Sequence, residues 1–120
     1  MLCVWVEGDP APQGSKSVGR YGQMYDQSHR LGPWREVVAW TVKLAAGKSR
    51  FPGQVQVELH FSLRLWADLD KLCRGVFDAL TESGVISDDK QVFTLAATKV
   101  MGKRAGQPYG VLILMKEMVV

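Results

Sequence analysis

Four aspartates, arranged as two pairs, are the residues whose type and spacing could do chemistry. Asp68 and Asp70 form the first pair, and Asp88 and Asp89 follow about 20 residues later. Side chains two apart in an extended chain point the same way, so Asp68 and Asp70 would project together there, whereas a helix would turn them about 200° apart. Hard divalent cations prefer carboxylate oxygens, and a bound cation can activate a water and stabilise charge on a phosphoryl group. The two pairs therefore predict a site for Mg²⁺, or alternatively Mn²⁺, that hydrolyses a phosphate ester.

Each pair also has a structural interpretation, which the residues alone leave open. Asp is a favoured N-cap, so one member of the first pair could simply cap the helix that follows. Asp88 and Asp89 could be ordinary turn residues.

The charge pattern allows the same two interpretations. Residues 68–91 carry 3 Lys+Arg and 6 Asp+Glu, while residues 1–67 carry 8 and 5 and residues 92–120 carry 4 and 1. An acidic block between basic flanks fits a cation site within a surface that attracts phosphate, or an acidic solvated helix.

The distance between the pairs adds a constraint. A helix over residues 70–83 would be roughly 20 Å long. The five residues 84–88 could span at most about 17 Å, so Asp89 returns to Asp70 of its own chain only if that loop doubles back almost taut. Two copies of the helix packed antiparallel about a two-fold axis would instead bring the first pair of one chain to the second pair of the other. We therefore expect a homodimer with two metal sites shared between the subunits.

The elements that must position these residues follow from hydrophobic periodicity. Strands are predicted over 2–7, 55–65, 92–100 and 111–119, and helices over 33–47, with Pro33 at the first position, and 69–84. A long connection over 8–32 contains a small hairpin around Gly19–Gly22, and Gly102–Gly110 is a basic hairpin loop. The order β-α-β-α-β-β predicts an α+β fold, in which one domain over 1–120 has a small mixed sheet with two helices packed on one face.

Length and composition exclude several classes of protein. The chain has 120 residues, of which 47% are hydrophobic and 22% charged, which is typical of one folded domain and excludes general disorder. No apolar run approaches the roughly 20 residues of a membrane span, and the start lacks the pattern of a secretory signal. Cys3 and Cys73 both lie in apolar strings, which predicts buried, reduced thiols in a cytoplasmic protein.

Three consecutive motifs resemble the signature of RusA-type Holliday junction resolvases, the crossover junction endodeoxyribonucleases. The family pattern is D-x-D-N-x-x-K, then D-A-L, then a glycine and a D-D pair. The corresponding segments here are Asp68-Leu69-Asp70-Lys71-Leu72-Cys73-Arg74, Phe77-Asp78-Ala79-Leu80 and Gly84-Val85-Ile86-Ser87-Asp88-Asp89. The early Pro10-x-Pro12-Gln13-Gly14-Ser15-Lys16 and the Trp34-Arg35 pair resemble phage and prophage members. The likeness covers nearly the whole chain.

This resemblance implies a RusA-like fold and a homodimeric, Mg²⁺-dependent endonuclease that cuts four-way DNA junctions symmetrically in recombination and repair. It implies that Asp68, Asp70 and Asp89 are the essential metal-binding carboxylates, with Asp88 beside them. It also implies that metal binding depends on the dimer.

Two departures from the family pattern bear on activity. The family's Asn is Lys71 here, and its Lys is Arg74. Arginine can grip phosphate bidentately but cannot usefully give up a proton. If the family Lys is an electrostatic clamp, Arg74 can replace it; if it is a proton donor, Lys71 must serve, or activity is weak. Arg74 could alternatively bridge Asp70 and Asp78, which lie four residues away on either side.

Two further interpretations stay open beside the nuclease. One is a catalytically weak or inactive protein of the same fold that binds DNA junctions, and the other is a metal-binding dimer that acts through protein contacts. Steep loss of affinity with salt would distinguish a DNA binder from the latter.

The remaining basic residues suit a surface for branched DNA, although part of them could be scattered surface charge. The predicted phosphate contacts are Lys16, Arg20, Arg30, Arg35, Lys103 and Arg104. Trp66, just before the first acidic pair, could stack on an unpaired base or pack at the edge of the sheet.

Overall fold

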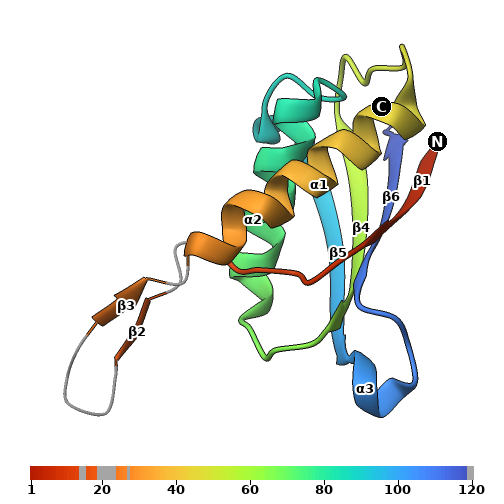
Figure 1. Ribbon diagram of the computed structural model, residues 1–120. Helices are drawn as coiled ribbons and strands as arrows, with labels where there is room; N and C mark the ends of the chain where they lie inside the picture. The colour runs from red at the N-terminus through yellow and green to blue at the C-terminus, as the bar shows by residue number, and fades with distance from the viewer. Residues whose placement is uncertain (14–15, 19–23, 27, 119–120) are drawn as a thin grey trace.

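The structure is a computed structural model that describes the backbone of residues 1–13, 16–18, 24–26 and 28–118, and side chains in 1–13 and 29–118. Its main sheet has four strands in the order β1-β6-β4-β5 (Figure 1). These strands are β1 (Leu2–Glu7), β4 (Val55–Leu63), β5 (Val92–Met101) and β6 (Gly110–Glu117). β6 runs antiparallel to both β1 and β4, whereas β4 and β5 are parallel. The sheet is therefore mixed, with β5 at one edge.

Two helices cover one face of this sheet, as Figure 1 shows. They are α1 (Ser28–Ala46) and α2 (Leu69–Ser83), which also pack against each other. The 3-10 helix η1 (Asp89–Gln91) follows α2, and the short helix α3 (Gly102–Ala105) follows β5. The predicted α+β fold with two helices on one face of a mixed sheet is confirmed.

The alternating sequence of β4 builds the centre of the core. Its apolar residues Val55, Val57, Leu59, Phe61 and Leu63 are each at most 2% exposed. They pack beneath apolar residues of both helices, with Val38 and Val42 from α1 and Leu72, Val76 and Leu80 from α2. Because one face of α2 is continuously apolar, the helix is fixed on the sheet and its opposite face is left for polar residues.

The small hairpin predicted in the long connection is also present. β2 (Lys16–Val18) and β3 (Met24–Asp26) pair antiparallel and project from the body in Figure 1. The turn predicted around Gly19–Gly22 lies outside the described residues. Gln13 anchors the start of this segment, because its backbone N–H donates to Lys71 O at 3.0 Å in the first turn of α2.

Two predictions were wrong, one on the start of a helix and one on the connection between two strands. α1 begins at Ser28 and continues through Pro33, which has no N–H and therefore leaves the carbonyl group four residues earlier without its helical hydrogen bond. Gly102–Gly110 is not a hairpin loop, because β6 pairs with β4 and not with β5. The connection instead passes the end of β4 and forms α3, where Gly102 packs so tightly on Ser62 and Tyr109 that no side chain would fit.

The cysteines behave differently from each other. Both are free thiols, and Cys73 is buried as predicted. Burial, with a smaller contribution from the charge of Asp70, raises the pKa of Cys73 to about 11, so this thiol stays protonated at neutral pH. Cys3 is exposed, contrary to the prediction, because it lies on the face of β1 that alternates away from the buried Val4 and Val6.

Among the helices in the described part of the chain, none combines the length and the apolar character needed to cross a membrane.

Candidate metal-binding site at the two ends of helix α2

The first acidic pair lies where α2 begins. Asp68 is the N-cap residue, with an extended backbone (φ −69°, ψ 134°), but its side chain makes no capping hydrogen bond. Its carboxylate is 47% exposed and lies 3.7 Å from Lys71 Nζ. Asp70 is exposed in the first helical turn. The capping alternative therefore does not account for the Asp68 side chain, and both carboxylates face solvent.

The second acidic pair lies in the turn that leads into η1. The Asp88 side chain caps η1, accepting a hydrogen bond from Lys90 N–H at 2.8 Å. That backbone hydrogen bond, followed by one from the Asp89 carboxyl group, lowers the pKa of Asp88. The same contact between the two side chains raises the pKa of Asp89, to which the negative charges of Asp88 and Asp78 add. Asp88 thus has the turn role considered from the sequence, while its carboxyl group also meets that of Asp89.

The fold separates the two pairs along α2. Asp88 and Asp89 lie beside the last turns of the helix, where with Asp78 and Glu82 they line a surface depression of about 340 Å³. Asp70, in the first turn of α2, and Asp78 are about 12 Å apart along the helix axis, at a helical rise of 1.5 Å per residue. Within the described ranges, no three His, Cys, Asp or Glu side chains are grouped to hold a metal ion. One chain therefore assembles each pair but does not bring the pairs together.

The donor chemistry nevertheless fits the expected cation. All four groups are carboxylates at exposed or half-exposed positions, which leaves room for the waters that Mg²⁺ retains. The described residues of one chain do not form a site that contains both pairs.

The two basic residues that replace the family's Asn and Lys lie beside the first pair. Lys71 contacts Asp68, whereas Arg74 is exposed one turn after Asp70. Among described residues, Arg74 forms no ion pair with Asp70 or Asp78, so the proposed structural bridge is not formed.

The predicted DNA contacts fall into two groups. Lys103 and Arg104 are exposed on α3, at the same end of the molecule as the start of α2 (Figure 1). Arg30 and Arg35 are held in ion pairs instead. Arg30 is 17% exposed and donates to Asp9 at 3.3 Å and to Pro10 O at 3.1 Å. Lys16 begins β2 with its side chain undescribed, and Arg20 lies outside the described residues.

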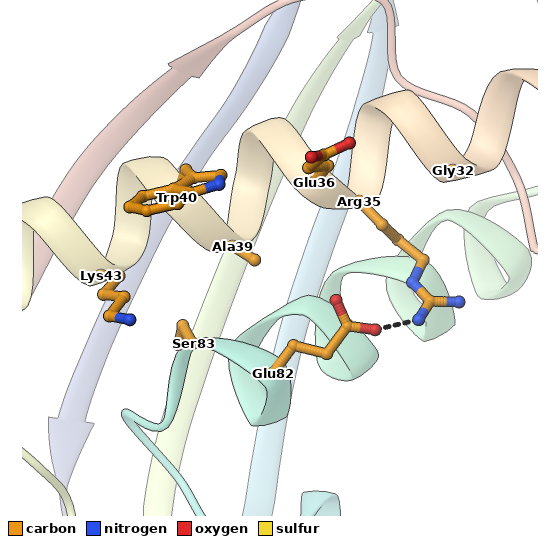
Figure 2. Close-up of a pocket in the computed structure, with 8 residues that line it drawn as sticks. All are labelled: Gly32, Arg35, Glu36, Ala39, Trp40, Lys43, Glu82 and Ser83. Atoms are coloured by element: carbon orange, nitrogen blue, oxygen red, sulfur yellow. Dashed lines mark hydrogen bonds and ion pairs between the residues drawn. The ribbon is translucent and has the colours of Figure 1, made fainter.

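Arg35 links the two helices rather than projecting freely. Figure 2 shows it paired with Glu82 of α2. Both residues line a depression of about 480 Å³, as do Trp40 and Lys43. This larger depression lies along α1 and does not include the acidic pairs. The basic side chain that lines the depression with Asp88 and Asp89 is thus already neutralised in part by an acid.

Sequence reasoning missed three features of this region. Gln91 bonds to the acidic turn, and its spacing three residues after Asp88 is the signal of a capping box. Asp9 is bound by Arg64 at 2.8 Å as well as by Arg30, a long-range contact without a local signal. The third is Lys99, whose Nζ lies 4.1 Å from the ring centre of Trp66; Trp66 itself is 68% exposed and not buried at the edge of the sheet.

Paired carboxylates flanked by exposed cations are typical of metal-dependent enzymes that act on polyanions. A family model described as Endodeoxyribonuclease RusA matches residues 7–107, a range that includes every predicted site residue. The chain therefore belongs to the RusA family of endodeoxyribonucleases, and this membership implies a nuclease that resolves Holliday junctions. No match was found among curated proteins.

Proposed function

We propose that the chain is a Mg²⁺-dependent, structure-specific endonuclease of the cytoplasm that works as a homodimer. It resolves four-way DNA junctions in recombination and repair by paired hydrolysis of phosphodiester bonds. The observation that carries the proposal is the placement of two exposed carboxylate pairs at opposite ends of one helix in a RusA-family chain.

The dimer follows from this placement. Two α2 helices packed antiparallel would bring Asp68 and Asp70 of one chain toward Asp88 and Asp89 of the other. The neighbouring edge strand β5 supplies apolar surface for such contact, since Phe93 is 58% exposed and Leu95 45% exposed. Leu95 is paired with the buried Val57, so it shares the helix-covered face of the sheet yet remains uncovered. An exposed apolar strip beside α2 supports an interface there.

Each residue has a role in this proposal. Asp68, Asp70 and Asp89 would hold the ion, with Asp88 beside them. When bound, the ion supplies Lewis acidity and an activated water. Arg74 and Lys71 stabilise the negative charge that develops on the phosphate, and Arg74 can grip phosphate oxygens because no carboxylate among the described side chains pairs with it. Lys103 and Arg104 contact phosphates of the junction arms, and Lys16 and Arg20 extend that surface. Arg30 and Arg35 contribute less to it, because acidic side chains already pair with them.

Cleavage of a synthetic four-way junction tests the activity. Wild-type protein with Mg²⁺, or with Mn²⁺, should give paired nicks in opposite strands, whereas a linear duplex of the same sequence should stay intact. Asp70→Asn should leave the junction uncut while still binding it. Equal nicking by the wild type and by Asp70→Asn would exclude the proposed site.

Mixed dimers test the sharing of sites between subunits. An Asp70→Asn chain paired with an Asp89→Asn chain has one site with both substitutions and one with neither. We therefore expect single nicks from the mixture, although each variant alone is inactive. Failure to recover nicking in a mixture shown to exchange subunits would mean that each site is built within one chain.

Arg74 favours a second candidate, a protein that binds junctions but cuts them weakly. The side chain is exposed and retains its charge, but it cannot donate a proton usefully. Arg74→Lys should raise kcat if proton donation limits the reaction, and should leave kcat unchanged if the residue is an electrostatic clamp.

A further inference from the structure

The Gln91 side chain makes four hydrogen bonds that join two separate loops. Its Oε1 accepts from the backbone N–H groups of Ser87 at 2.7 Å and Asp88 at 3.3 Å. Its Nε2 donates to the carbonyl oxygens of Phe51 at 2.7 Å and Gly53 at 2.8 Å. A primary amide has two acceptor sites and two donor hydrogens, so the capacity of this side chain is fully used.

The loop that Gln91 reaches holds the acidic segment at its other end as well. Phe51 N–H donates to Val85 O at 2.9 Å, and the Arg50 guanidinium donates to Gly84 O. Residues 50–53 therefore bind both ends of the segment 84–91. This segment carries the second acidic pair from the end of α2 to the start of β5.

The middle of the segment has little else to fix it. Ser87, Asp88, Asp89 and Lys90 are all exposed, so apolar packing does not determine where their backbone lies. Hydrogen bonds must do so, and those of Gln91 connect the turn to a distant part of the fold, whereas the Asp88–Lys90 cap is internal to it. The position of the acidic pair relative to α2 therefore depends on this amide.

The chemistry of the amide suits this task. A glutamate could accept from the two N–H groups but would face the Phe51 and Gly53 carbonyl oxygens without a proton to donate. A lysine could donate to the carbonyls but could not accept, and its charge would attract the acidic pair that a cation must bind. A neutral amide joins the two loops without changing the charge of the site.

We propose that Gln91 is a positioning residue for the Asp88–Asp89 half of the metal site. It touches neither cation nor DNA, but its link to residues 50–53 sets where the second pair meets the first pair of the partner chain. The inference rests on the proposed function, since it assigns these carboxylates to the metal. Groups that orient metal ligands in this way commonly change metal affinity by 10- to 100-fold when removed.

The test compares Gln91→Met, which keeps the length but removes all four hydrogen bonds, with Gln56→Met as the matched control. Gln56 is half-buried on β4 and lies outside the acidic turn. The first measurement is the Mn²⁺ dissociation constant, obtained by electron paramagnetic resonance of the free ion. The second is the Mg²⁺ concentration that gives half-maximal junction cleavage, together with kcat at saturating Mg²⁺ and junction affinity without divalent ion.

Gln91→Met should weaken Mn²⁺ binding by about 10-fold or more and raise the half-maximal Mg²⁺ concentration in parallel. Saturating Mg²⁺ should restore most of kcat, and junction affinity without divalent ion should stay unchanged. A general loss of structure would lower all of these quantities together. Gln56→Met should match the wild type throughout.

If Gln91→Met does not fold, Gln91→Glu provides the measurement, because it retains the acceptor side and loses only the link to residues 50–53. Weaker Mn²⁺ binding despite the added negative charge supports the proposal, and unchanged or tighter binding overturns it. Wild-type protein that neither binds Mn²⁺ nor cuts the junction would overturn the proposed function itself. Wild-type protein that does both, matched by Gln91→Met, would overturn only the role of Gln91.

Discussion

The two ends of α2 present their carboxylates in different ways. Asp68 and Asp70 are carried by backbone that the core fixes, because Ala67 is 4% exposed and Leu72 fully buried on either side of them. Asp88 and Asp89 lie in an exposed turn, where the hydrogen bonds that Lys90 N–H donates to Asp88 and that Asp88 N–H donates to Gln91 determine their placement. Substitutions in the first pair should therefore alter the chemistry and leave the fold unchanged. Substitutions in the second pair should also alter the turn that holds the two carboxylates.

The largest expected effect is on cleavage activity, from a substitution at the start of α2 that should leave the stability of the fold unchanged. Asp70→Asn should lower junction cleavage by about 100-fold or more, because it removes a ligand of the ion that would stabilise charge in the transition state. Its free energy of unfolding should stay within about 0.5 kcal/mol of wild type, because the carboxylate is exposed. Single-turnover cleavage and thermal denaturation measure the two quantities. A large loss of stability would show that Asp70 has a structural role.

The basic residues near the two ends of α2 should also differ in how much they contribute to DNA binding. Lys103 and Arg104 are exposed on α3 at the Asp68–Asp70 end, whereas Arg35, near the second pair, is bound to Glu82. Replacing both α3 cations by alanine should weaken junction binding and reduce the slope of log affinity against log salt by about 2. Arg35→Ala should change that slope less. Fluorescence anisotropy over a salt series measures both, and a larger change from Arg35→Ala would reverse the assignment.

A glycine marks the second end of the helix and has no equivalent at the first. Gly84 adopts φ +82° as the C-cap of α2, and an added Cβ would collide with the Arg50 guanidinium. Gly84→Ala should therefore destabilise the fold by about 1 kcal/mol or more, measured by urea denaturation. It should also raise the Mg²⁺ requirement, because residues 84–91 begin there. Gly106→Ala is the control for a left-handed glycine remote from this segment.

The same contrast explains how much could be predicted from the sequence. α2 was predictable because its apolar residues recur on one face, and the acidic pairs stood out by residue type and spacing. The placement of β6 between β1 and β4 was not, because periodicity gives the faces of a strand and not its neighbours. Nor were the bonds from Gln91 to Phe51 and Gly53, which join residues about 40 apart in the chain. Local signals identified the carboxylates, but long-range contacts decide where the second pair lies.

The smallest expected effect concerns the repulsion within the second pair. The contact with Asp88 raises the pKa of Asp89, so the folded chain holds this proton more tightly than the unfolded chain does. At neutral pH Asp89 is ionised beside Asp88, which costs stability, and this cost disappears as the pH falls through the pKa of Asp89 in the folded state. Asp89→Asn should therefore raise the melting temperature slightly at pH 7 without divalent ion, because its amide can donate to Asp88 without adding charge.

The gain from Asp89→Asn should shrink as the pH is lowered, and Mg²⁺ should reverse its sign. Bound cation stabilises the wild type by mass action, whereas the variant has lost a ligand. Melting curves at neutral and acidic pH, with and without Mg²⁺, measure these changes. Asp70→Asn is the control, because the Asp70 carboxylate does not share the contact that couples Asp88 to Asp89. An equal pH-dependent gain from both variants would mean that the two ends of α2 do not differ in the way their carboxylates are held.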